Sequence, residues 1–141
     1  MTGAEYFAAL SDAVRRHDAA MRIVTDGEPR RGEGGGVHSS SISDPTARAA
    51  ESAMRAQETV DAMQEIIGEG LRVIEAIRVT LGAEYGDALD ARYIDLLSWR
   101  DVAARLGCTH PTAMARAGAA IDWYDHKGRA WLLDQVADTT H

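Results

Sequence analysis

The sequence has little cysteine, few aromatic residues and no long apolar run, and each shortage excludes a class of protein or site. Cys108 is the only cysteine, which excludes an intramolecular disulfide and a cysteine-rich zinc site. No apolar run approaches the about 20 residues needed to cross a bilayer, so we expect no membrane partner. The opening segment MTGAEYFAAL has no basic leader, so we expect no signal peptide and a cytoplasmic protein.

Catalytic motifs are also lacking. Residues 25–44 are rich in glycine and serine, but no Lys-Ser/Thr pair follows the glycines and no strand pattern precedes them. We therefore interpret this segment as a flexible linker and not as a phosphate loop. The sequence shows no Ser/His/Asp or Cys/His arrangement and no pair of carboxylates in a recognisable cleft context. It predicts a protein that is not an enzyme and needs no cofactor.

The residues that are present favour helices. Hydrophobic residues make up 45% of the 141 residues and are dominated by alanine, with one Phe and three Trp. Small side chains with high helix propensity favour helices that pack closely. This hydrophobic content, beside 26% charged residues, argues against global disorder. We therefore predict an all-α fold in one domain, or in a small domain with an extended arm.

A first helix is predicted within residues 1–24. Thr2 and Glu5 have the spacing of a capping box, in which each side chain bonds the backbone N–H of the other residue. Side chains at intervals of three and four then form one helix stripe, with a packing histidine among them: Phe7, Leu10, Val14, His17, Met21 and Val24.

A long helix is predicted over residues 45–82. Asp44 has the position of an N-cap, and Pro45 that of the first helical turn, where its missing N–H costs nothing. Gly68 and Gly70 predict either a bend or a closely packed partner. We expect the apolar seam of this helix to pair with the first helix, to form a dimer, or to do both. Two interleaved rows with heptad spacing make up the seam: Thr46, Ala53, Val60, Ile67, Ile74 and Leu81, and Ala49, Ala56, Met63, Gly70 and Ile77.

A compact helix-turn-helix domain is predicted over residues 83–133. Gly82 and Gly86 bracket a break after the long helix. Asp87 and Asp90 suit the start of a new helix, where negative charge meets the positive end of the helix dipole.

Two short helices then meet at a tight corner. Ser98 has the position of an N-cap, and we expect Asp101 to pair with Arg105 on the outside of the first helix. Gly107 is typical of a residue that ends a helix, and Thr109 of one that caps the next. We expect the following residues to face the core: Trp99, Val102, Ala103, Leu106, Ala113, Ala117, Ala120, Ile121 and Tyr124.

Charge is distributed unevenly along the chain. The net charge is −7, yet residues 92–116 contain four arginines against two aspartates, a net charge of +2. A short positive strip on an acidic body predicts weak binding to DNA. With about four phosphate contacts, the logarithm of affinity would fall with the logarithm of salt concentration at a slope of about −3.6.

The stretch YIDLLSWRDVAARLGCTHPTAMARAGAAIDWYD resembles the helix-turn-helix of region 4 in sigma-70-type factors. That motif has an aromatic-acidic-x-Ala-x-x-Leu-Gly run followed by a recognition helix capped by serine or threonine. Within this group, the chain is most similar to phage and prophage transcriptional regulators of the RinA/ArpU kind, and its SISDPTARAA segment is similar to openings seen there. The resemblance covers residues 84–128 well and 40–83 loosely. It implies a DNA-binding regulator of phage late or packaging genes.

We expect the second helix of the motif to lie in the major groove of double-stranded DNA. Small outward residues let a helix lie deep in the groove, and arginine against guanine is the commonest specific contact. A homodimer reading two half-sites, or tethering by RNA polymerase, would compensate for weak single contacts. The predicted DNA-binding residues form a base-facing set and a phosphate-facing set: His110, Thr112, Ala115 and Arg116, and Arg100, Arg105 and Thr109.

Two other functions stay open from the sequence. One is a small packaging-terminase-like DNA-binding subunit, whose helix-turn-helix sits on an oligomerising helical arm. The other is a protein-interaction module that keeps the fold without contacting DNA.

The C-terminal segment carries one further pattern. Asp122, Asp125 and His126 have spacings that suit a metal site, but we interpret them as a solvated polar edge, so no metal is predicted. Residues 131–133 predict a final packing turn, and residues 134–141 a frayed tail.

Overall fold

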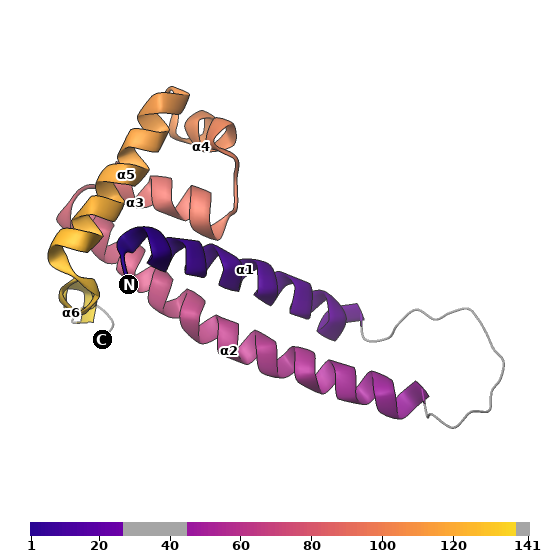
Figure 1. Cartoon of the computed structure of the whole chain (residues 1–141). Coiled ribbons are helices and arrows are strands. Elements are labelled where there is room, and N and C mark those ends of the chain that lie inside the picture. The colour runs from indigo at the N-terminus through magenta and orange to yellow at the C-terminus, as the bar shows by residue number, and fades with distance from the viewer. Residues whose placement is uncertain (27–44, 138–141) are drawn as a thin grey trace. The chain divides into compact units, whose positions relative to one another are not determined.

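The structure of the protein, a computed structural model, describes residues 1–26 and 45–137, and these form helices without any strand (Figure 1). The predicted all-α class is therefore confirmed. The linker predicted over 25–44 lies mostly outside the described residues, and Thr25 and Asp26 instead continue the first helix. In chain order the elements are α1 (Gly3–Asp26), α2 (Pro45–Thr80), α3 (Ala83–Leu89), the π-helix η1 (Asp90–Ile94), α4 (Trp99–Leu106), α5 (His110–Lys127) and α6 (Arg129–Ala137).

α1 begins with the predicted capping box. The N–H of Glu5 donates to Oγ1 of Thr2 at 3.1 Å, and the N–H of Thr2 donates to Oε1 of Glu5 at 2.9 Å. The backbone N–H of Thr2 holds the pKa of the exposed Glu5 carboxyl below its ordinary value. The N–H of Gly3 donates to Oδ1 of Asp125 at 2.6 Å, so α5 supplies a carboxylate to the positive end of α1.

The chain divides into two compact units, and the division falls inside both long helices. We name Met1–Val14 together with Ile66–His141 the core unit, and Arg15–Glu65 the hairpin unit. This division differs from the predicted domain over 83–133 with a separate N-terminal arm. The first turns of α1 are part of the core unit because Phe7, which is 0% exposed, is packed into its hydrophobic cluster.

α2 runs without interruption from Pro45 to Thr80, two residues short of the predicted end. Its interior glycines do not break it. Gly70 is buried, and a Cβ atom added there would lie 2.5 Å from Cδ1 of Leu10 in α1. The glycine therefore allows α1 and α2 to approach closely within the core unit. Of the two explanations for the glycines, the structure shows close packing of a partner at Gly70, whereas a Cβ atom added to Gly68 would meet only Nη1 of Arg72 in the same helix, at 3.8 Å.

Helices α1, α2 and α5 meet in the centre of the core unit. The ring of Tyr6 stacks on that of Tyr124 with 4.9 Å between centroids, and the ring of Phe7 meets that of Tyr124 edge-on at 5.6 Å. The largest fully buried side chains of the unit are Phe7, Leu10, Val73, Ile74, Ile77, Leu89, Val102 and Leu132.

Asp87 lies inside α3 and does not start a helix, contrary to the prediction, and Asp90 begins η1, which directly continues α3. α3 begins four residues before Asp87, at Ala83, and both carboxylates face Arg78 of α2. Oδ1 of Asp87 lies 2.8 Å from Nε of Arg78, and Oδ2 of Asp90 lies 3.5 Å from Nη2. The two aspartates therefore tie α3 and η1 to α2.

α6 extends further than the predicted packing turn. Residues 134–137, predicted as part of a tail, are helical, and Val136 is buried together with Leu132. Lys127 places its Nζ 4.9 Å from the ring centroid of Trp123 and 4.7 Å from that of Trp131, which joins α5 to α6. In the part of the chain that the structure describes, no helix is both long and apolar enough to cross a membrane.

Candidate nucleic-acid interface

The connection into α4 is irregular. Leu96 has a φ of 59°, in the left-handed region, and the N–H of Leu97 donates to the carbonyl of Ala91 at 3.1 Å. A left-handed residue with such a bond is a common way for a helix to end. The chain then turns so that Oγ of Ser98 accepts the N–H of Asp101 at 3.2 Å, which is the predicted cap of α4.

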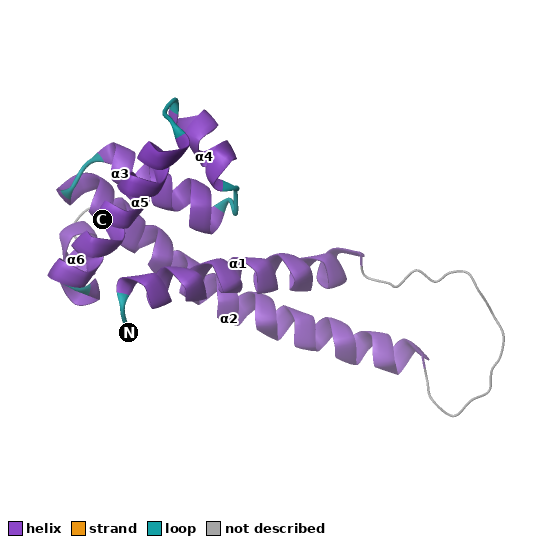
Figure 2. Ribbon diagram, turned by 45° about the horizontal axis from the view of Figure 1, so that its top comes forward, coloured by secondary structure: helices purple, strands orange, loops and turns teal. Residues whose placement is uncertain are grey.

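The corner between α4 and α5 depends on Gly107. Its φ of 69° and ψ of 37° lie in the left-handed region, as predicted for a residue that ends a helix. The N–H of Cys108 donates to the carbonyl of Ala103 at 3.0 Å, which closes the corner. Figure 2 shows α4 beside the N-terminal end of α5, joined to it by this short turn.

Thr109 caps α5, as predicted. Its Oγ1 accepts the N–H of Thr112 at 3.3 Å, and its hydroxyl group donates to the hydroxyl oxygen of Thr112 at 2.8 Å. Pro111 stands in the first turn, where a missing N–H leaves no donor unpaired. Because Thr112 accepts the bond from Thr109, its own hydroxyl hydrogen can still be donated outward.

α4 and α5 pack through small side chains. Their shared cluster consists of four buried residues: Ala91, Val102, Ala103 and Ala113. Cys108 packs against this cluster as a half-buried free thiol. The inward face predicted for α5 is confirmed, since all its members are buried or half-buried: Ala113, Ala117, Ala120, Ile121 and Tyr124. Methyl-sized side chains at the crossing let the two helix axes approach closely.

The opposite face of α5 is bare. His110 and Ala115 are exposed, whereas Thr112 and Arg116 lie half-buried on its flank. A Cβ atom added to Gly118 would meet no atom within 4 Å, so this face is open at its middle. The residues exposed along it are mostly small, although Met114, 46% exposed, is among them: Pro111, Met114, Ala115, Gly118, Ala119 and Asp122.

The four arginines of residues 92–116 are not equivalent. Arg92 is half-buried, with its guanidinium group 4.6 Å from the centroid of the Trp99 ring and its Nη1 donating to the carbonyl of Leu97 at 2.9 Å. Arg92 therefore holds the connection before α4 in place and does not belong to the outer surface.

Arg105 pairs with Asp95 and not with Asp101, contrary to the prediction. The two side chains are 49% and 41% exposed, so this ion pair contributes little to stability and a phosphate group can compete for the arginine. Arg100 and Arg116 have no carboxylate partner among the described residues. The positive charge available to a ligand therefore comes mainly from these two arginines.

The C-terminal half of α5 is acidic. Asp122 is exposed on the same bare face, so the positive region is confined to the first turns of the helix. Asp125, which sequence reasoning placed on a solvated edge, bonds Gly3 of α1 instead. No local pattern signals that bond, because its partner lies at the other end of the chain. Within the described residues, no cluster of three potential ligands that suits a metal ion is present.

Comparisons of the chain with protein-family models, with curated proteins and with solved structures give no match. The function is therefore inferred from the residues and their geometry.

Proposed function

We propose that the protein is a sequence-specific DNA-binding transcriptional regulator in which α5 is the recognition helix. The observation that carries the proposal is the capped corner at Gly107, from which the first turns of α5 emerge with a bare outward face. A helix with small outward side chains fits the major groove, which is about 12 Å wide. The resemblance to regulators of the RinA/ArpU kind makes phage or prophage genes the proposed targets.

The first turns of α5 supply the proposed base contacts. Arg116 reaches a guanine edge, and the methyl group of Ala115 meets a thymine methyl group. The Thr112 hydroxyl donates to a base acceptor, and His110 contacts the edge nearest the start of the helix. These roles use side chains that are exposed or lie on the flank of the bare face.

Phosphate contacts come from α4 and from the corner. The exposed Arg100 contacts one phosphate, and Arg105 exchanges Asp95 for an oxygen of another. The first amides of α5 behind Thr109 point at a further phosphate. Two arginine–phosphate contacts per module predict a salt slope of about −1.8, half of the value expected from four contacts. Such a module binds weakly alone and benefits from a second copy or from tethering by RNA polymerase.

A protein-interaction module is the second candidate. The net charge of −7 and the exposed Asp122 on the bare face of α5 favour it, because both oppose the approach of phosphate. A packaging-terminase-like DNA-binding subunit uses the same helix-turn-helix and differs in its assembly.

The proposal is tested by selecting bound fragments from a random-sequence duplex library and measuring affinity for the selected duplex by fluorescence anisotropy. Arg116→Ala is expected to cost about 1–3 kcal/mol and to relax specificity at one position, and Arg100→Ala to reduce the salt slope by about 1. Arg72→Ala is the matched control, because it removes one exposed positive charge from α2.

The outcomes separate the candidates. Unchanged affinity and salt slope for Arg116→Ala would show that α5 does not read the bases. Absence of any DNA binding by the wild-type chain at low salt would favour the protein-interaction module instead.

A further inference from the structure

The hairpin unit buries few apolar side chains for its length of helix. Its described helices cover residues 15–26 of α1 and 45–65 of α2. Of the 22 buried hydrophobic residues of the described chain, three belong to this unit: Ala20, Ala56 and Val60. Most of the stability of a helix in a protein comes from the packing of its apolar face. Burial of further apolar surface against a partner would therefore stabilise this unit.

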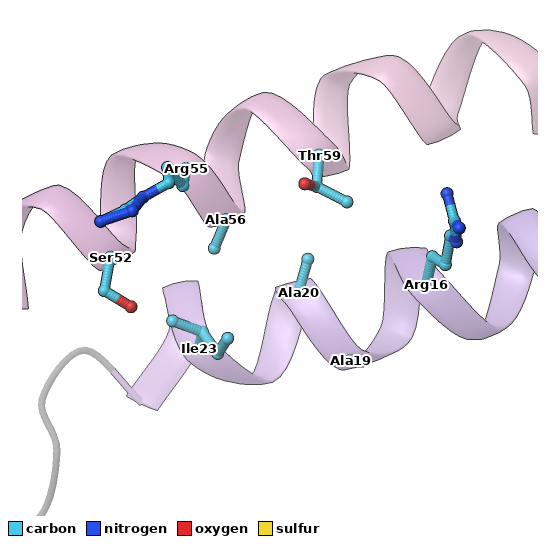
Figure 3. Close-up of a pocket in the computed structure, with 8 residues that line it drawn as sticks. All are labelled: Arg16, Ala19, Ala20, Ile23, Ser52, Arg55, Ala56 and Thr59. Atoms are coloured by element: carbon cyan, nitrogen blue, oxygen red, sulfur yellow. The ribbon is translucent and has the colours of Figure 1, made fainter.

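A groove of about 570 Å³ runs between the two helices of the unit (Figure 3). Figure 3 shows Ala20 and Ala56 directed into it from opposite helices. Ile23 also lines the groove, and 47% of its surface is exposed. Ser52 and Thr59 add two hydroxyl groups from α2. An apolar groove between helices is the kind of surface that the apolar face of an amphipathic helix occupies.

The charged side chains that line this groove have one sign. Arg16 of α1 and Arg55 of α2 line it, whereas the four acidic residues of α2 within 45–65 do not. Arg55 lies 3.8 Å from Glu51 on its own helix, and the two side chains are 69% and 70% exposed, so this ion pair is weak. Because a guanidinium group has several N–H donors, each arginine can bind a further carboxylate. The groove therefore complements a ligand that is both apolar and acidic.

The two arginines stand at opposite ends of the groove. In Figure 3, Arg16 lies at one end, and Arg55 lies at the end where Ile23 is found. Arg16 and Ile23 are seven residues apart on α1, which is about 10.5 Å along the helix axis. A helix lying along the groove would thus meet the arginines with acidic side chains about two turns apart. Its apolar side chains between those turns would meet the alanines.

We propose that the groove binds an acidic amphipathic helix of a partner protein. The apolar side chains of that helix pack on Ile23 and on the alanines, and its carboxylates pair with Arg16 and Arg55. A nucleic acid fits this groove less well, because its phosphates would pair with the arginines but leave the apolar base uncovered. The proposal rests on the hairpin unit alone and holds whether or not α5 binds DNA.

Fluorescence anisotropy at low salt with labelled designed peptides tests the proposal. The probe is a helical peptide of glutamate, leucine and alanine, with glutamate at every seventh position and leucine three and four positions later. A second peptide carries lysine in place of glutamate. The wild-type chain is expected to bind the lysine peptide at least about tenfold more weakly than the glutamate peptide. The groove variant, Arg16→Glu combined with Arg55→Glu, is expected to reverse this preference.

The matched control combines Arg22→Glu with Arg72→Glu. It makes the same change of net charge on the same two helices, at exposed positions that do not line the groove, and should keep the wild-type preference. A groove variant that had lost helix could not gain affinity for the lysine peptide, so misfolding cannot imitate the expected result. Ile23→Ser should weaken binding of the glutamate peptide more than about fivefold, whereas Val79→Ser, at a 65% exposed position outside the groove, should not.

Several outcomes would overturn the proposal. These are failure of the wild type to bind the glutamate peptide, and equal effects of the groove variant and its control. Weaker binding of a random-sequence duplex by the groove variant, with unchanged peptide binding, would assign the groove to nucleic acid instead. A wild-type dimer in sedimentation equilibrium that the groove variant dissociates would assign it to a second copy. Peptide binding by a chain that binds no DNA would count against the proposed function only.

Discussion

The hydroxyl group of Tyr6 donates a 2.7 Å hydrogen bond to Oε2 of Glu69, from α1 to α2 in the core unit. Nη1 of Arg129 lies 2.8 Å from the other oxygen of the same carboxylate, so one half-buried glutamate joins α1, α2 and α6. Burial raises the pKa of Tyr6 well above its ordinary value, and the bond to Glu69 raises it further. The hydroxyl therefore stays protonated and keeps its role as a donor.

Tyr6→Phe is expected to lower the free energy of unfolding by about 1–2 kcal/mol, because Glu69 loses a donor in a partly buried place. Urea denaturation measures the change. Tyr85→Phe is the matched control, since the hydroxyl of Tyr85 has no hydrogen-bond partner among the described residues. An equal effect of the two substitutions would contradict the role assigned to Glu69.

Substitutions at two glycines of the helix-turn-helix distinguish the effect of backbone strain from that of side-chain packing. A Cβ atom added at Gly107 or at Gly118 meets nothing within 4 Å, but only Gly107 has a positive φ. Gly107→Ala is expected to destabilise the fold by about 1 kcal/mol or more, since alanine is strained in the left-handed region. Gly118→Ala is expected to stabilise it by about 0.5–1 kcal/mol, as in a helix interior. If both substitutions shift the free energy of unfolding in the same direction, the left-handed conformation assigned to Gly107 is contradicted.

Stability near Asp90 is expected to depend on pH. Burial raises the pKa of the Asp90 carboxyl above its ordinary value, and the carboxylate of Asp95 raises it further. The folded chain therefore binds this proton more tightly, and the resulting stability is present below the ordinary pKa and lost as pH rises through the raised pKa. The melting temperature of Asp90→Asn relative to that of the wild type should therefore be higher at about pH 7 than at about pH 4. Thermal melts measure this difference.

The control for this prediction is Asp134→Asn, which removes an exposed carboxylate of α6. Its difference in melting temperature from the wild type should change less between the two pH values. If the melting temperature of Asp90→Asn relative to the wild type is instead higher at acid pH, the pKa of Asp90 is lowered by Arg78 more than it is raised by burial.

The bare face of α5 is expected to reject negative charge when it binds DNA. Ala115→Glu should weaken binding of the selected duplex by more than about tenfold, because a carboxylate would replace a methyl group against the groove. Ala130→Glu makes the same change at an exposed position of α6 and should leave affinity nearly unchanged. Equal losses for both variants would indicate a general charge effect and not contact through α5.

The features that could be predicted from the sequence are local ones. A cap joins residues three positions apart, so the bonds of Thr2 with Glu5 and of Ser98 with Asp101 follow from spacing alone. Periodicity likewise identified the buried rows of α1 and α5, because one helix face needs no knowledge of its partner. The left-handed conformation of Leu96 could not be predicted from the sequence, because leucine seldom adopts that conformation.

Contacts between distant segments could not be predicted in this way. Arg105 turns to Asp95 of the preceding connection, although Asp101 lies at the favourable spacing on its own helix. Arg78 attracts the two aspartates that resembled a helix start. In each case the fold offers a closer partner than the local pattern does. The number of arginines free to contact phosphate could therefore be read only from the structure.

The most direct test of DNA recognition by α5 is an NMR titration of isotopically labelled protein with the selected duplex, following each backbone amide. The proposed interface predicts that the largest shifts fall on residues 109–119, with smaller shifts near Arg100 and Arg105. Shifts confined to the hairpin unit, or an unperturbed α5 in the bound protein, would contradict it.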